Sequence, residues 1–303
     1  MTNEIQTLIN ALQKEVKEIK VESEKEDALL RLEEIAKEYS GEDKIISSLD
    51  LAEMMKNRPA QTKIMSGYKE LDDILDGFRH KQLIVLSGAT KSGKTSFAIE
   101  ITSRIKDFNP MWLPFEEPAE ELIQKFLDRN EQPPLFYTPQ RILGNTLLWV
   151  EKKIIESKAK YNSQVVFIDH LHFLVDFGDN MSQEIGKTMR SLKRLAVKWN
   201  IVIVLIAHLR KTKIDAQPDL DDLRDSSFIA QEADTVVIVW RETKKEAGEI
   251  IITNNINVSV QANRRTGKTG NVKMVYENGK FLMIDWRPEA KAESEYNSWG
   301  KKW

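Results

Sequence analysis

The chain has 303 residues, of which 41% are hydrophobic, and this length accommodates one large α/β domain with a smaller appendage, or two domains. Its formal net charge of −2 excludes an overall field that would attract nucleic acid, so any contact with DNA has to come from local basic loops. It lacks cysteine, which excludes disulfides and thiolate zinc sites, and it has neither an apolar run of about 18 residues nor a signal peptide, so we expect a cytoplasmic protein without a membrane partner.

Residues 3–40 predict amphipathic helices, because their apolar side chains recur at spacings of three and four positions. These helices could form a hairpin or short coiled coil that only assembles subunits, or they could bind a specific partner. A short helix over 49–55 should end before Pro59, because proline disfavours a helical conformation in the residue before it. We therefore predict a helical N-terminal region over 1–62, whose last helix could dock on a neighbouring subunit.

After Ser66 the pattern changes to apolar segments that alternate with helical ones, which is typical of a mostly parallel sheet with crossover helices. Near the C-terminus, two alternating runs flank Asn278-Gly279, a strong signal for a β-hairpin. We expect one α/β domain over 63–287 and a polar, flexible tail over 288–303. The predicted strands of the parallel part are 83–87, 111–115, 165–169, 201–207, 235–240 and 256–261.

A phosphate-binding loop is predicted between the first strand and the helix that follows it. The segment fits the pattern G-x-x-x-x-G-K-[ST] at every fixed position. Backbone N–H groups in such a turn, together with the N-terminus of the next helix, cradle the phosphates of a nucleotide. The expected nucleotide-binding residues are Gly88, Ala89, Thr90, Lys91, Ser92, Gly93, Lys94, Thr95 and Ser96.

Carboxylates at two further strand ends suit the same chemistry. Asp169 follows four apolar residues and would deliver its carboxylate to a Mg²⁺ ion, on which the Thr95 hydroxyl can also sit. Glu116 and Glu117 lie where another strand meets a helix, and hydrolysis needs a carboxylate that orients and deprotonates the attacking water. Alternatively, these two acids only favour the first turn of that helix through its dipole.

His170 and His172 beside Asp169 form an H-x-H pattern, which can bind metals. No thiolate or further histidine lies near them in the sequence. We therefore expect these histidines to pack or hydrogen-bond at the strand end.

Several segments together carry a family resemblance. In chain order they are SGYKELDDILDGF, PFEEPAEEL, FIDHLHFL, IAHLRK, DLRDSSFIAQEAD and NRRTGKTG. With the glycine loop, they make the chain from about Ser66 to Asp285 resemble the RecA-like motor domain of DnaB-type replicative helicases. AHLRK and RRTGKTG are more similar to the helicase half of phage helicase-primases and of mitochondrial Twinkle than to cellular DnaB. The resemblance implies a RecA-like P-loop NTPase fold.

The resemblance also implies roles in ATP hydrolysis. Lys94 and Thr95 would hold the phosphates and Mg²⁺, Asp169 would support the metal, and Glu116 would be the catalytic carboxylate. His208 would sense the γ-phosphate, although a histidine at this strand end could instead be a core residue.

Two further positions match residues that clasp the nucleobase in these helicases. They are Arg241 and Tyr276, and a cation over an aromatic ring is a suitable device for that purpose.

Single-stranded DNA in such helicases passes through a channel lined by two loops, which correspond here to 176–182 and 210–224. Basic side chains in the second loop would neutralise phosphates without reading the base sequence. Alternatively, this is a solvated charge run, because the same loop carries several aspartates. The predicted DNA contacts are Arg210, Lys211, Lys213 and Arg224.

The resemblance assigns Arg264 to the arginine finger, which reaches the γ-phosphate held by an adjacent subunit. Arg265 is the alternative if the turn is shifted by one residue. The family usually has a lysine two residues before the finger, whereas Ala262 stands here. One of two cationic contacts with the neighbouring subunit is therefore missing.

Together these features predict a ring-forming, ATP-driven replicative DNA helicase that uses Mg²⁺ and moves 5′-to-3′ on single-stranded DNA as a homo-oligomer, expected to be a hexamer. About 60 N-terminal residues are too few for a primase domain, so a primase, loader or polymerase would be a separate chain. Two other interpretations share this core: a RecA- or RadA-like recombinase filament, and a regulatory or loader ATPase that binds protein instead of DNA.

Overall fold

The chain divides into two compact units, residues 1–60 and 61–303. The helices expected within 3–40, the tail over 288–303 and the predicted DNA contacts Arg210, Lys211, Lys213 and Arg224 lie outside the described residues. The computed structural model describes residues 46–57, 62–128, 131–175, 181–208, 218, 219, 222, 226–246 and 249–284.

In the first unit, the predicted short helix is α3 (Ser48–Lys56). It begins after Ser47, whose hydroxyl accepts a hydrogen bond from the backbone N–H of Asp50 at 3.1 Å and so caps the helix. None of its side chains is buried among the described residues, and Leu49 and Met55 are largely exposed. The helix itself is confirmed, and its docking on a neighbour stays a prediction.

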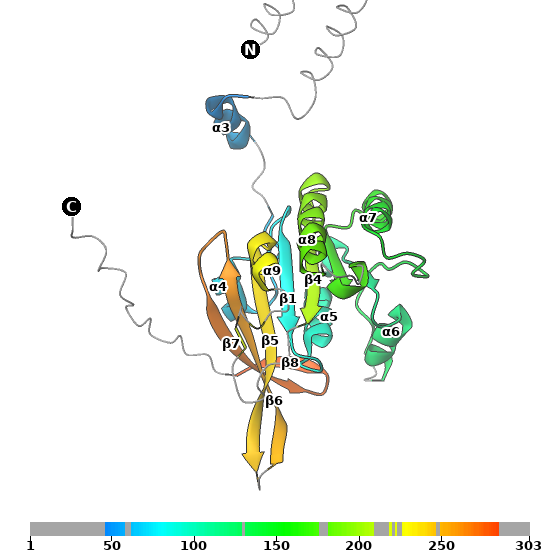
Figure 1. The fold of residues 1–303 in the computed structure, drawn as a ribbon, viewed down its shortest axis with the longest axis vertical. Helices are drawn as coiled ribbons and strands as arrows, with labels where there is room; N and C mark the ends of the chain where they lie inside the picture. Colours follow the sequence, from blue (N-terminus) through cyan, green and yellow to red (C-terminus); the bar gives the residue numbers. More distant parts are fainter. Residues whose placement is uncertain are drawn as a thin grey trace, which may run out of the picture. The chain divides into compact units, whose positions relative to one another are not determined.

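In the second unit, the described strands form one eight-stranded sheet in the order β2-β3-β4-β1-β5-β6-β7-β8 (Figure 1). The first five in this order are parallel, and β6 to β8 continue the sheet antiparallel. This confirms the expected RecA-like α/β fold with its C-terminal hairpin. The strands are β1 (Leu83–Gly88), β2 (Met111–Pro114), β3 (Val165–Asp169), β4 (Val202–His208), β5 (Thr235–Glu246), β6 (Glu249–Asn263), β7 (Gly270–Glu277) and β8 (Lys280–Met283).

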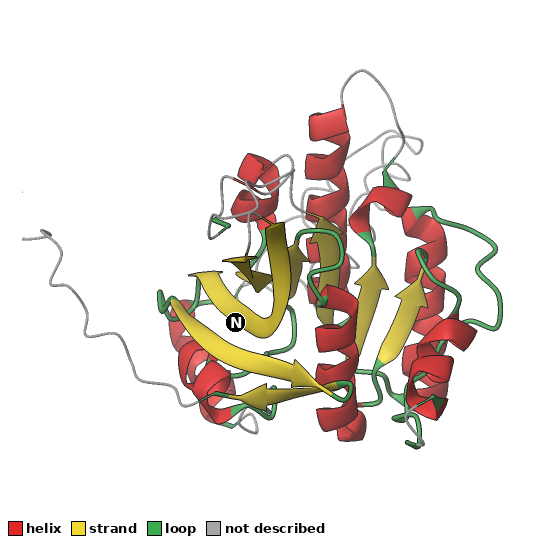
Figure 2. Ribbon diagram, turned by 90° about the horizontal axis from the view of Figure 1, so that it is seen from below, coloured by secondary structure: helices red, strands yellow, loops and turns green. Residues whose placement is uncertain are grey.

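Helices cover both faces of this sheet (Figure 2). Side chains alternate across β1, so Ile84 and Leu86 join the core under α4, α5 and α6, while Leu83 and Val85 join the core under α7, α8 and α9. Among the described residues, no helix has the length and apolar character to cross a membrane. The helices are α4 (Lys69–Leu75), α5 (Lys94–Arg104), α6 (Ala119–Leu127), α7 (Leu147–Tyr161), α8 (Met181–Lys198) and α9 (Ser226–Glu232), with 3₁₀ turns η1 (Lys106–Phe108) and η2 (Leu171–Leu174).

Strands β5 and β6 are longer than predicted. Pairing of β6 with β7 begins at Asn255, so residues before it form a two-stranded ribbon with β5 that extends beyond the other strands (Figure 1). Ile251 and Ile252 of this ribbon are exposed, and charged residues dominate the facing part of β5, so no alternating apolar pattern marks the extension. The hairpin at Asn278-Gly279 is confirmed, and both residues have positive φ angles, 49° and 79°.

The parallel strands bring the predicted site together at their carboxyl ends. In the register of the sheet, Gly88 at the end of β1 pairs with His208 at the end of β4. Asp169 at the end of β3 pairs with Pro114 of β2, which places Glu116 just beyond the same edge. The carboxyl edge of a parallel sheet is the usual place for ligands in such folds.

Candidate nucleotide-binding and catalytic site

The glycine loop joins β1 to α5. A Cβ atom at Gly88 would lie 2.2 Å from the carbonyl oxygen of Val239 and 2.5 Å from Ser92 Oγ, so only glycine fits there. Lys91 and Gly93 adopt positive φ angles of 63° and 97°, which turn the chain sharply before the helix. The first N–H groups of α5 have no partner within the helix. This is the backbone arrangement that binds a phosphate chain.

Lys94 opens α5, and its side chain is buried. Its Nζ donates a hydrogen bond to the carbonyl oxygen of Ala89 at 2.8 Å, which holds the ammonium over the loop. Burial lowers the pKa of Lys94 to about 8, while the carboxylates of Asp169 and Glu116 counteract part of this shift. A desolvated ammonium gains strongly from a bound polyanion, because the anion replaces the interactions that water no longer provides.

The side chains of Thr95 and Asp169 fit a magnesium ion. Thr95 Oγ1 donates to Asp169 Oδ2 at 2.8 Å, and burial raises the pKa of Asp169 to about 6, against the effect of this hydrogen bond. The other oxygen, Asp169 Oδ1, is buried and has no hydrogen-bond partner among the described residues. A buried carboxylate oxygen without a partner is costly. Beside a hydroxyl oxygen it forms the kind of donor set that Mg²⁺ prefers.

Glu116 lies beside Asp169 and faces two imidazole rings. Its backbone N–H donates to the carbonyl oxygen of Asp169 at 3.1 Å, which ties together the ends of β2 and β3. Its Oε2 lies 3.6 Å from His170 Nε2 and 3.5 Å from His208 Nε2. With 40% of its side chain exposed, Glu116 can accept a proton from a water molecule.

The neighbouring acid has different surroundings. Glu117 forms an ion pair with Lys125 of α6, whereas the charge of Glu116 acts on Lys94 in the glycine loop. The structure therefore places Glu116, and not Glu117, next to the predicted phosphate site.

The expectation that no further histidine approaches the H-x-H pair is wrong. The ring centroids of His170 and His208 are 4.4 Å apart, because β3 and β4 are neighbours in the sheet. His170 Nδ1 accepts a hydrogen bond from the backbone N–H of His172 at 3.2 Å, and burial lowers the pKa of His170 to about 3, so the neutral ring carries its proton on Nε2. Nε2–H then faces Glu116 as a donor and lacks the lone pair that a metal ion needs. This tautomer disfavours a metal ion between Glu116, His170 and His208.

His208 lies between the glycine loop and Glu116. Burial lowers its pKa, and the Lys94 ammonium adds to this effect, so the ring is neutral. Its Nδ1 is buried without a hydrogen-bond partner among the described residues. A neutral imidazole at this place suits the predicted contact with a terminal phosphate.

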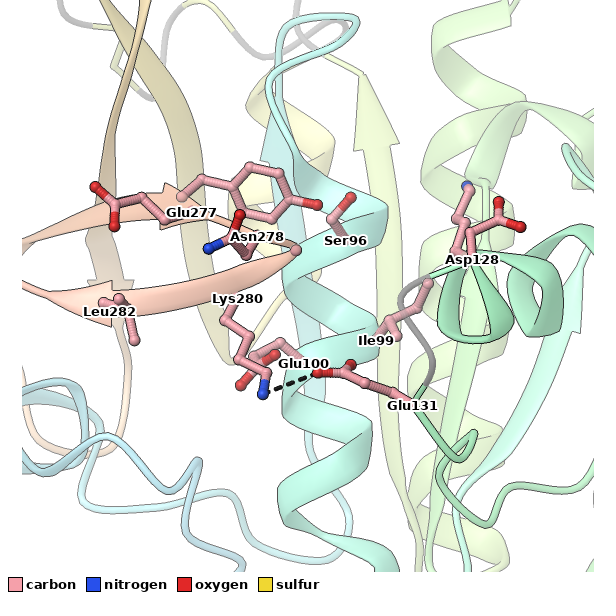
Figure 3. Close-up of a pocket in the computed structure, with 12 residues that line it drawn as sticks. Ser96, Ile99, Glu100, Asp128, Glu131, Glu277, Asn278, Lys280 and Leu282 are labelled. Atoms are coloured by element: carbon pink, nitrogen blue, oxygen red, sulfur yellow. Dashed lines mark ion pairs between the residues drawn. The ribbon is translucent and has the colours of Figure 1, made fainter.

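Arg241 and Tyr276 approach each other across β6. The guanidinium carbon of Arg241 lies 5.4 Å from the centre of the Tyr276 ring, within the range of a cation–π contact. Tyr276 and Ser96 both line a pocket of about 760 Å³ between α5, the end of α6 and the β7–β8 hairpin, which Figure 3 shows. Carboxylates outnumber lysines in this lining, so the pocket suits a base and ribose better than phosphate. The charged residues are Glu100, Asp128, Glu131, Glu277, Lys125 and Lys280, of which Lys280 and Glu131 pair at 2.8 Å.

Replacing Tyr276 by leucine should raise the KM for ATP by about 2- to 30-fold, since a cation–π pair contributes roughly 0.5 to 2 kcal/mol. Tyr276→Phe keeps the aromatic face and should leave KM within about twofold of the wild-type value. Turnover at saturating ATP should be unchanged in both variants. Steady-state kinetics over a range of ATP concentrations measure both quantities, and a KM unaffected by Tyr276→Leu would remove this residue from the site.

Arg264 and Arg265 follow β6 at the opposite end of the sheet from the glycine loop. The backbone N–H of Arg264 donates to the carbonyl oxygen of Asp234 at 2.9 Å, and the N–H of Asp234 donates to that of Leu83, the first residue of β1, at 2.8 Å. Gly88 ends β1, roughly 17 Å further on at about 3.3 Å per residue. Arg264 is therefore too far from the glycine loop of its own chain to contact a nucleotide there.

One residue of the site was missed by sequence reasoning, namely His170 as a group that faces Glu116. The signal was present, because His170 and His208 both stand at the ends of apolar strands. It could be used only with the order of β3 and β4 in hand. The roles of the predicted DNA contacts stay predictions, since those residues lie outside the described part of the chain.

Comparisons with known proteins agree with this geometry. The family described as DnaB-like helicase C terminal domain matches residues 63–136 and 131–283. The replicative DNA helicase DnaB of Rickettsia conorii is 28% identical over 294 residues, which cover 77% of this chain and 60% of that protein. The protein of the same name from Geobacillus stearothermophilus is 25% identical over 285 residues, covering 81% and 62%. The chain thus spans about 60% of the length of these relatives.

Solved structures share the fold at lower sequence identity. The ATPase domain of a phage helicase has a TM-score of 0.65 and 20% identity, covering 80% of this chain and 100% of that domain. A DnaB-like replicative helicase, described with its interactions with primase, has a TM-score of 0.64 and 20% identity, covering 93% of this chain and 77% of that one.

Proposed function

Because the chain belongs to the family of DnaB-like helicase C-terminal domains, we propose that it is an ATP-driven motor that forms a hexameric ring, moves along single-stranded DNA and unwinds duplex DNA. The meeting of Lys94, Glu116, Asp169 and His208 at one edge of the sheet carries this proposal. Together they provide a phosphate cradle, a general base, a metal ligand and a sensing group.

The side chains divide the work of ATP hydrolysis between them. Lys94 and the N-terminus of α5 bind and orient the phosphates. Glu116 accepts the proton of the attacking water. Thr95 and Asp169 would hold Mg²⁺, which when bound neutralises charge on the phosphates. His208 lies beside both the loop and Glu116, so it can link occupancy of the phosphate site to the catalytic carboxylate.

The distance between Arg264 and the glycine loop supports a site shared between subunits. In a ring, Arg264 of one subunit would stabilise charge on the γ-phosphate bound by the next. The missing lysine at Ala262 leaves this arginine as the cation that the family pattern predicts on the strand end.

Partners follow from the relatives by analogy. Those relatives are named replicative DNA helicases, and one solved relative is described with its interactions with primase. We propose that single-stranded DNA is the track of this motor, travelled 5′-to-3′. A primase, loader or polymerase would act as a separate chain.

Turnover of ATP with and without single-stranded DNA, and displacement of a labelled strand from a forked duplex, test this function. We expect DNA to stimulate turnover, displacement to require ATP, and Lys94→Ala to abolish both. Homologous pairing without strand displacement would support a recombinase filament instead. Turnover indifferent to DNA would support a loader or regulatory ATPase.

The basic loop should contribute to DNA affinity through phosphate contacts. Replacing Arg210, Lys211 and Lys213 together by alanine should weaken single-strand binding and flatten its salt dependence, each lost contact lowering the slope by roughly 0.7. Fluorescence anisotropy over a salt series measures this slope.

A matched control removes the same charge elsewhere. Alanine at Lys152, Lys158 and Lys160, all on α7, should leave the slope unchanged. Equal slopes for the two triple variants would assign the basic loop to solvated surface.

A further inference from the structure

The turn that carries Arg264 is built on the C-terminal end of α4. Asn263 Nδ2 donates to the carbonyl oxygens of Ile74 at 3.4 Å and Leu75 at 3.2 Å, which as the last carbonyls of the helix have no partner within it. Asn263 Oδ1 accepts a hydrogen bond from the backbone N–H of Arg265 at 3.2 Å. The residue before Arg264 therefore binds both the helix end and the rest of the turn.

Arg265 anchors the turn from the other side. Its guanidinium donates to Asp76 Oδ2 at 2.6 Å, and to the carbonyl oxygens of Leu75 at 3.1 Å and Asp76 at 3.2 Å. The planar fork of N–H donors suits this combination of a carboxylate with two carbonyl groups, whereas a lysine ammonium could not match it. Lys268, later in the turn, adds a hydrogen bond to the carbonyl oxygen of Asp73 at 3.1 Å.

The helix end that receives these contacts is itself fixed. Asp72 of α4 accepts hydrogen bonds from the backbone N–H groups of Ser66 at 2.8 Å and Gly67 at 3.2 Å, and the apolar side of α4 is buried in the core. Asp76 ends the helix in the left-handed conformation and also pairs with Lys63 and with Arg79. The turn is thus bound to a rigid element.

Arg264 differs from both of its neighbours. Its side chain is exposed and has no hydrogen bond or ion pair with the described residues. We propose that Arg265 and Asp76 are positioning residues that aim Arg264 at the nucleotide of the adjacent subunit. This inference rests on the proposed function, because it requires a site shared between subunits. Fixing the backbone on both sides of a long side chain limits the volume that its guanidinium samples, which lowers the entropy lost on contact.

Arg265→Ala should lower ATP turnover by about 10- to 100-fold, because a displacement of about 1 Å can cost a catalytic group about 10²-fold. Lys63→Ala is the matched control, since Lys63 pairs with the same Asp76 carboxylate but does not contact the turn. It should stay within about twofold of the wild-type turnover, as expected for a surface ion pair.

Mixing experiments separate misplacement of the finger from damage to the variant's own site. Lys94→Ala subunits, which cannot hydrolyse ATP but carry an intact turn, should restore turnover to Arg265→Ala subunits. Subunits with both changes should not restore it. Asp76→Asn keeps the shape of the helix end and removes its charge, and we expect a loss of about 3- to 10-fold that is restored in the same way. If Arg265→Ala subunits do not assemble, Asp76→Asn decides by the same criteria.

The inference is overturned if Arg265→Ala matches Lys63→Ala while Arg264→Ala is inactive. It is also overturned if Arg265→Ala is slow and mixing restores only Arg264→Ala. Wild-type turnover in Arg264→Ala would instead contradict the shared site of the proposed function, so the two failures give different results.

Discussion

Glu116→Gln is expected to bind ATP with wild-type affinity and to lose about 10²- to 10⁴-fold in turnover, the usual contribution of a general base. The amide keeps the size of the side chain and can still approach His170 and His208, which face the carboxylate at 3.6 Å and 3.5 Å. It cannot accept the proton of the attacking water at neutral pH. Binding of a fluorescent ATP analogue and steady-state phosphate release measure the two quantities separately.

Glu117→Gln is the matched control for this prediction. Its carboxylate pairs with Lys125, so its loss should change turnover by no more than about twofold, as for other exposed ion pairs. If Glu117→Gln were inactive and Glu116→Gln active, the catalytic acid would be misplaced by one residue.

Arg264→Ala is expected to bind ATP and to assemble normally, yet to hydrolyse ATP about 10³- to 10⁵-fold more slowly, which is the usual effect of losing an arginine finger. The exposed guanidinium has no ion pair among the described residues, so its removal should not affect the fold. Its distance from the glycine loop of its own chain requires that the loss be felt in a neighbouring subunit. Phosphate release at saturating ATP measures the effect.

Mixed assemblies provide the control. Lys94→Ala subunits should partly restore turnover to Arg264→Ala subunits, because they supply an intact finger to a competent site. Subunits that carry both changes should not. No restoration in mixtures that demonstrably co-assemble would show that the site is not shared between subunits.

Features that depend on a contiguous segment could be predicted from the sequence. The loop from Gly88 to Thr95 carries its own turn, cation and hydroxyl, and Asp169 follows an apolar strand whose bounds were predicted residue for residue. The approach of His170 to His208 could not be predicted, because it depends on β3 and β4 being neighbours, and local patterns do not give the order of strands.

Long-range polar contacts were hidden for a related reason. Arg265 and Asp76 are 189 residues apart in the sequence and meet only because β6 ends beside the end of α4. Sequence reasoning could therefore name Arg264 and Arg265 as alternatives but could not distinguish an exposed arginine from an anchored one. The outer parts of β5 and β6 were missed because a ribbon exposed on both faces has no buried side to impose alternation.

Electron microscopy of the chain with single-stranded DNA and a slowly hydrolysed ATP analogue tests the central claim most directly, since it reports how subunits arrange around a shared nucleotide site. A ring motor predicts closed or gapped rings with Arg264 of each subunit beside the glycine loop of the next. Continuous helical filaments along the DNA would contradict this account and support a recombinase.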